Sequence, residues 1–184
     1  MIFDLIKNRR SVFPAQYNDR PIDKADIKKL LEAANWAPTH KKTEPWRFRV
    51  LMGDAKERLG IFLSHKYLET EERPKQMKVK KLVENPKRAG AIIAICMQRD
   101  PGESLPEWEE LAAVSMAVQN MWLCCTEMGI GCYWSSPGLI QYMNEFFDME
   151  KGETCFGLFY MGNYDGELPE VTRGPIEDKV VWIE

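Results

Sequence analysis

The stretch from Asn8 to Ser11 (Asn-Arg-Arg-Ser) places two guanidinium groups and a hydroxyl at one point of the chain. A guanidinium keeps its charge at any cellular pH, and its planar set of N–H donors suits phosphate and carbonyl oxygens. The serine adds a small donor for an anionic ligand. Two arginines at the end of a helix can also serve only to offset the helix dipole, so this stretch by itself is a weak indication of an anion site.

Two further stretches carry polar groups that could face a ligand. Ala37 to Phe48 contains His40, which lies in a predicted loop before a predicted strand, with two lysines after it. A loop histidine is either incidental or part of a charged site. Trp134 to Ser136 lies where a strand passes into a loop, so backbone N–H groups there could face a ligand; a plain strand–turn–helix corner has the same pattern.

Familiar nucleotide and nucleophile motifs are missing. The chain has no GxxxxGK[ST] phosphate loop and no GxSxG turn. Gly129 to Gly131 follows a predicted helix and precedes a strand, the reverse of a dinucleotide-binding fingerprint, so it is predicted to stop the helix. The five cysteines form no CxxC pair and lie in or beside apolar runs, which favours packing as reduced thiols in a cytoplasmic protein. With two histidines and no zinc-ligand spacing, we expect no metal site.

Size and charge limit the class of protein. A chain of 184 residues is expected to form one domain, 1–184, with 163–184 as an extended C-terminal tail. The net charge of −3 argues against a general nucleic-acid surface. The most apolar helix, Leu111 to Cys125, is too short to cross a bilayer, so no membrane partner is expected.

Apolar periodicity predicts a mixed α+β fold. We expect helices over residues 2–8 (with Phe3, Leu5 and Ile6 inward), from Asp23 to Pro38, and over Ala55–Leu68, Lys75–Val83, Glu107–Met128 and 139–147. We expect strands over Trp46–Met52, Ala91–Met97, Cys132–Ser135 and Cys155–Met161. These elements suit a central, mostly antiparallel sheet flanked by helices around the long buried helix 107–128.

Two segments are harder to place. Glu69 to Arg88 mixes both charges and is typical of a solvated helix or a lid. The tail ends on the apolar run Val180 to Ile183. Exposed apolar residues at a chain end are unfavourable, so this run is expected to pair with a sheet edge, either of its own chain or of another subunit.

These motifs resemble the nitroreductase superfamily of FMN-dependent oxidoreductases, in its short single-domain bacterial branch. The resemblance covers nearly the whole chain, and the first and last motifs together are fairly specific. It rests on Asn8–Ser11, Ala37–Pro38 with His40–Lys41, Pro45–Phe48, the long core helix, Gly129–Gly131 with Trp134–Ser136, Phe159–Gly162 and Arg173–Glu177.

The resemblance implies a homodimer with two FMN sites at the subunit interface. Arg9, Arg10 and Ser11 would contact the phosphate, the ribityl chain and the pyrimidine edge, Arg173 would help hold the phosphate, His40 would reach the partner subunit's FMN, and Trp134, Ser135 and Ser136 would line the isoalloxazine. Three positions depart from the family pattern: Trp36 and Ser135 stand where the family often has a basic residue, and Val171 stands where the tail often has a lysine.

The leading hypothesis is an FMN-dependent reductase that uses NADH or NADPH to reduce electron-poor acceptors such as nitroaromatics and quinones, with hydride transfer through flavin N5. No catalytic side chain can be named, because no obligatory acid or base is expected. Two alternatives stay open. One is a flavoenzyme of this fold with other chemistry, such as dehalogenation or metabolite oxidation under a lid. The other is a flavin- or partner-binding module with negligible turnover.

Overall fold

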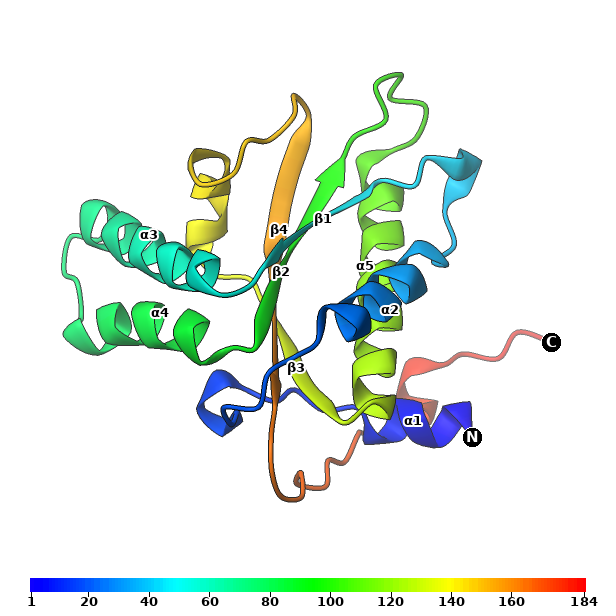
Figure 1. The fold of residues 1–184 in the computed structure, drawn as a ribbon. Coiled ribbons are helices and arrows are strands. Elements are labelled where there is room, and N and C mark those ends of the chain that lie inside the picture. The colour runs from blue at the N-terminus through cyan, green and yellow to red at the C-terminus, as the bar shows by residue number, and fades with distance from the viewer.

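A four-stranded antiparallel sheet forms the centre of the computed structural model, which describes all residues, 1–184 (Figure 1). Its strand order is β1-β2-β4-β3. The strands are β1 (Trp46–Leu51), β2 (Ala91–Gln98), β3 (Ile130–Ser135) and β4 (Glu153–Asn163). The α+β class and the antiparallel sheet predicted from the sequence are therefore confirmed.

Strand β2 lies inside the sheet, between β1 and β4. Every residue from Ala91 to Met97 is buried. Side chains of a strand alternate between the two faces of a sheet. The continuous apolar run is therefore explained by cover on both faces: Ile93 and Ile95 belong to one apolar cluster, and Ile92 and Ala94 to the other.

Helices cover both faces of the sheet. The first face carries α2 (Lys24–Asn35) and α5 (Glu107–Glu127), and the second carries α3 (Asp54–Thr70), α4 (Gln76–Arg88) and the 3-10 segment η3 (Gly138–Glu145) (Figure 1). On α2, the helix predicted from Asp23 to Pro38, the residues Ile27, Leu30 and Ala34 recur at helical spacing and are buried. All five cysteines are free, and four of them are buried in these clusters.

Helix α5 is the long core helix that the sequence predicted, but only one of its faces is buried. Val114, Val118 and Met121 are fully enclosed against the sheet. On the opposite face Trp108 is 68% exposed and Met116 is 40% exposed. A large apolar side chain that stays in water does not contribute the favourable free energy that its burial would give. The single chain therefore leaves an apolar strip of its central helix uncovered.

Three local expectations were wrong. Residues 139–147 were expected to form an α-helix, but Gly138–Glu145 is a 3-10 helix. The helix predicted over Lys75–Val83, with its end near Asn85–Pro86, runs on to Arg88 with Pro86 inside it. It packs closely on α3, where a Cβ on Gly60 would lie 3.0 Å from the Val83 oxygen. Phe3 and Ile6 of α1 (Ile2–Asn8) are exposed, because nothing in this chain covers that side of so short a helix.

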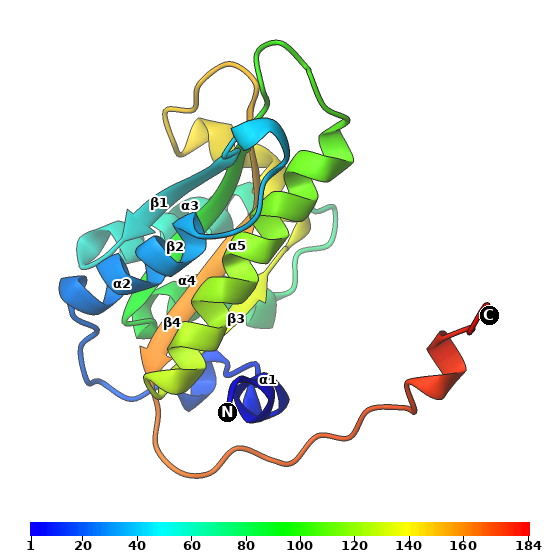
Figure 2. The same cartoon turned by 90° about the vertical axis from the view of Figure 1, so that its right-hand side faces the viewer.

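The segment after β4 leaves the body of the protein. Every residue from Pro169 to Glu184 is exposed, and its only regular element is the short 3-10 turn η4 (Glu177–Lys179). Figure 2 shows this segment passing beneath α1 and then extending outward. None of the helices combines the length and the apolar character that crossing a membrane requires.

Candidate anion and cofactor site

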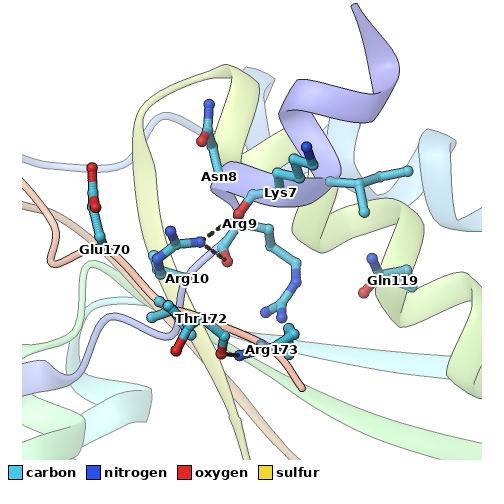
Figure 3. Close-up of a pocket in the computed structure, with 10 residues that line it drawn as sticks. Lys7, Asn8, Arg9, Arg10, Gln119, Glu170, Thr172 and Arg173 are labelled. Atoms are coloured by element: carbon cyan, nitrogen blue, oxygen red, sulfur yellow. Dashed lines mark hydrogen bonds between the residues drawn. The ribbon is translucent and has the colours of Figure 1, made fainter. Parts of the chain in front are cut away.

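A cavity of about 630 Å³ lies between the end of α1, the outer face of α5 and the C-terminal segment (Figure 3). Ten residues line it. Four of these are basic and one is acidic: Lys7, Arg9, Arg10 and Arg173, against Glu170. Because the whole chain is acidic, this local excess of positive charge is a specific feature of the cavity.

Arg10 fixes the C-terminal segment to α1. Its Nε donates to the carbonyl oxygen of Pro169 at 3.0 Å, and its Nη1 donates to the carbonyl oxygens of Lys7 at 2.6 Å and Arg9 at 3.0 Å. Two of the dashed lines in Figure 3 mark the bonds of Arg10 to Lys7 and Arg9. The bond to Pro169 anchors the segment just before Glu170 to Arg173, so those residues reach the cavity.

The Arg9 guanidinium has no acidic partner. It takes part in no ion pair and no hydrogen bond, and its Cζ lies 4.4 Å from the centre of the Trp122 ring. Partial burial lowers the pKa of Arg9, and the positive charges of Arg173 and Arg10 lower it further. The group stays charged because a guanidinium is not deprotonated in proteins. A partly buried cation with free donors is suited to bind an anion.

Arg173 adds a second available guanidinium. Its only hydrogen bond goes to the neighbouring carbonyl oxygen of Thr172, at 3.3 Å, and it forms no ion pair. In Figure 3 the Arg9 side chain points toward Arg173, while Glu170 lies beyond Arg10. The two arginines can therefore bind one anion from two sides. A phosphate monoester, with several acceptor oxygens and up to two negative charges, fits this donor set.

Ser11 follows Arg10 but does not line the cavity. Its side chain is exposed. The next residue, Val12, is buried, and its N–H donates to the carbonyl oxygen of Cys132 on β3 at 3.0 Å. The chain therefore turns from the cavity to the sheet edge within a few residues, and Ser11 lies at that transition.

His40 lies in a separate hollow of about 420 Å³ at the N-terminal end of α5, where Trp108 and Met116 also line the surface. Its Nδ1 is 2.7 Å from Oε2 of Glu109. Gln119, which lines the arginine cavity, is ten residues further along the same helix than Glu109. That spacing corresponds to about 15 Å at 1.5 Å per residue. One chain alone does not bring His40 to the arginines.

The loop after His40 has a strained backbone. Lys41, Lys42 and Glu44 have φ values of 50°, 56° and 42°, in the left-handed region that non-glycine residues rarely adopt. The contact of His40 Nδ1 with Glu109 Oε2 and the 2.9 Å hydrogen bond from Lys41 Nζ to the Ser104 oxygen hold this loop against α5. Strain of this kind persists where the surrounding structure fixes the backbone, often at functional sites.

Trp134 folds over β4. Its Nε1 donates to the Phe156 carbonyl oxygen at 3.2 Å, and a Cβ on Gly157 would lie only 2.0 Å from that nitrogen. Glycine at 157 is therefore what allows the indole to lie flat on the strand. Ser135 ends β3 and Ser136 is exposed just after it. These three residues, like His40, do not line the arginine cavity.

Sequence reasoning missed Gln119 and Trp122 as parts of this site. Gln119 was visible only as a polar residue inside an apolar helix. Nothing in the spacing connected Trp122 to Arg9, because the contact joins two segments far apart in the chain.

The sequence profile of the nitroreductase family matches residues 6–163. The chain belongs to the nitroreductase family. It is thus an oxidoreductase by family, and the resemblance drawn from its motifs is confirmed.

Similar proteins support this assignment over the full length. A Bacillus subtilis protein named "Putative NAD(P)H nitroreductase YfhC" is 29% identical over 182 residues, which cover 96% of this chain and 91% of that protein. The crystal structure of a nitroreductase-like family protein from Bacillus cereus has a TM-score of 0.87 at 29% identity, covering 100% of this chain and 96% of the other. A Desulfovibrio desulfuricans structure in complex with FMN has the same fold, with a TM-score of 0.76 at 20% identity and coverage of 100% and 96%.

Two departures from the nitroreductase-family pattern lie at different places. Val171 lines the arginine cavity, so the lysine that the resemblance led us to expect at this position would have added a positive charge to the cavity. Trp36 is exposed, and its Nε1 donates to Glu32 Oε1 at 3.1 Å on the surface of α2. The positive charge of the cavity therefore comes from Lys7, Arg9, Arg10 and Arg173.

Proposed function

We propose that this nitroreductase-family chain binds FMN, with the FMN phosphate between Arg9 and Arg173, and reduces electron-poor acceptors such as nitroaromatics and quinones with NADH or NADPH. The observation that carries the proposal is the cavity in which Arg9 and Arg173 present unpaired guanidiniums. The FMN complex of the Desulfovibrio relative and the name of the Bacillus subtilis relative favour the same cofactor and donor.

The residues of the site have binding and orienting roles. Arg9 and Arg173 hold the phosphate, and Arg10 keeps the C-terminal segment over the cavity. Ser11 and Trp134 to Ser136 are proposed to contact the flavin further along. Bound FMN would supply the redox chemistry, a two-electron hydride transfer from the nicotinamide to the acceptor. No side chain is assigned as an acid or base.

We further propose that the functional unit is a homodimer built on the outer face of α5. Trp108 and Met116 are apolar and exposed there, and the tail extends away from its own chain with Trp182 and Ile183 in solvent. A two-fold axis near the middle of α5 would pair each helix with its copy in antiparallel fashion. The His40 hollow of one chain would then approach the arginine cavity of the other, consistent with a role for His40 at the partner's flavin.

The experiment that tests the function is a visible spectrum of the purified full chain, alone and with added FMN. We expect flavin absorption bands that bleach on anaerobic addition of NADH or NADPH and return on addition of a nitroaromatic or a quinone. Comparing the two nicotinamides identifies the donor. A protein that leaves FMN absorption and fluorescence unchanged contradicts the proposal. Binding without bleaching would instead support a flavin-binding module.

A further inference from the structure

Trp122 connects α5 to the arginines of the cavity. It lies near the C-terminal end of α5, half-buried, and its ring meets Phe159 of β4 edge to face, with centroids 5.7 Å apart and planes at 79°. An indole fixed between a helix and a sheet has little freedom to move. Its outer surface is therefore a rigid platform.

Two contacts extend from this platform to consecutive residues. The Cζ of Arg9 lies 4.4 Å from the Trp122 ring centre, and the indole Nε1 donates to the carbonyl oxygen of Arg10 at 3.0 Å. The first contact orients a guanidinium, and the second fixes the backbone from which it extends. Together they set where Arg9 stands after α1 has ended.

An aromatic support has a different consequence from an acidic one. A carboxylate beside Arg9 would occupy its N–H donors and cancel its charge. A cation–π contact attracts the guanidinium through the ring face and leaves the donors in the guanidinium plane free. Arg9 has no carboxylate or carbonyl partner, so the Trp122 ring is its principal contact and its donors stay available to a ligand.

We infer that Trp122 is a positioning residue for the phosphate: it holds Arg9 and Arg10 in a binding geometry while it leaves the charge and donors of Arg9 free. This inference rests on the proposed FMN function and adds to it a residue that does not touch the ligand. It makes a distinctive prediction. Loss of Trp122 must weaken binding of a flavin that carries the phosphate more than of a flavin that lacks it.

The test measures dissociation constants of the full chain for FMN and for riboflavin, which has no phosphate, by flavin fluorescence. Trp122→Phe keeps a ring but loses the N–H, and Trp122→Leu loses both contacts. We expect FMN affinity to fall about threefold to tenfold in the Phe variant and about tenfold to fiftyfold in the Leu variant. Riboflavin affinity should stay within about twofold of the parent in both. Trp36→Leu, at an exposed position just after α2, is the matched control for a lost tryptophan and should bind FMN as the parent does.

A double-variant cycle isolates the route through Arg9. In an Arg9→Ala background, adding Trp122→Leu should change the free energy of FMN binding by less than a third of the change that Trp122→Leu causes in the parent. The reason is that the guanidinium that Trp122 positions is already gone. An undiminished effect, or equal losses for FMN and riboflavin in Trp122→Phe, would overturn the inference. If the parent protein binds FMN normally in that experiment, the proposed function still stands. If the parent binds no FMN, the function itself fails.

Discussion

Arg9 and Arg173 line one cavity, although one follows the first helix and the other lies in the C-terminal segment. The link between them is Arg10, which donates to Pro169 and so brings the segment back across α1. Neither guanidinium has an acidic partner. The arrangement leaves two positive charges accessible to a ligand. Unpaired guanidiniums of this kind are not needed to stabilise the fold.

Replacing either arginine should weaken FMN binding selectively. A charge-assisted hydrogen bond contributes about 1.5–3 kcal/mol, so Arg9→Ala and Arg173→Ala should each raise the FMN dissociation constant about tenfold to 100-fold. Arg58→Ala, at an exposed position on α3, is the control and should bind as the parent does. Fluorescence titration checks this. Unchanged FMN affinity in both cavity variants would show that the FMN phosphate does not bind at this site.

The sequence predicted the framework well because its signals are local. The apolar run of β2 requires cover on both faces, and the spacing on α2 requires one buried side. The cluster Arg9–Arg10 was visible by residue type alone. What was missed depends on contacts between distant segments. The stacking of Trp122 on Arg9, and the placement of His40 in its own hollow against Glu109, follow from packing that no periodicity encodes.

The exposure of Phe3 and Ile6 has a related cause. Periodicity identifies an apolar side but not the surface that covers it, and that surface need not belong to the same chain. The open face of α5 at Trp108 and Met116 is the same kind of feature. Both observations motivate a measurement of the oligomeric state.

A charge on the outer face of α5 should disrupt self-association. Met116→Glu places a carboxylate in the centre of the proposed dimer contact, where it would have to be desolvated without a partner. We expect the parent to sediment as a dimer and the variant as a monomer with reduced FMN affinity. Ile61→Glu, an exposed apolar position on α3, should leave the dimer intact. A monomeric parent at micromolar concentration would contradict the dimer.

The buried pair of Arg49 and Glu153 should make stability depend on pH. Glu153 is 2% exposed, and its Oε2 accepts a hydrogen bond from Arg49 Nη2 at 2.7 Å. This hydrogen bond holds the pKa of Glu153 below its usual range. The stabilisation is therefore complete above the unfolded pKa of about 4.3 and is lost as pH falls through the folded-state pKa.

Glu153→Gln should lower the free energy of unfolding by about 2–3 kcal/mol at pH 7, because it leaves a half-buried guanidinium with a weaker partner. It should also lose less stability than the parent between pH 6 and pH 3. Urea denaturation at several pH values measures both effects. Parallel pH curves for the two proteins would show that this pair does not contribute to the acid sensitivity.

A methyl group at position 157 should displace Trp134. The added Cβ would meet the indole nitrogen and the Ser135 carbonyl oxygen at 2.0 and 2.7 Å, so the tryptophan must leave Phe156. Gly157→Ala is expected to cost about 1–3 kcal/mol and to change the tryptophan fluorescence. Gly138→Ala is the matched control, because a Cβ there meets no atom within 4 Å. Equal melting temperatures for the two variants would contradict the packing described here.

The most direct test of the central claim is a crystal structure of the full chain with FMN. We expect the FMN phosphate oxygens within hydrogen-bond distance of the guanidiniums of both Arg9 and Arg173, with Arg9 still stacked on Trp122. A phosphate bound elsewhere, with these two arginines contacting only solvent, would contradict the account.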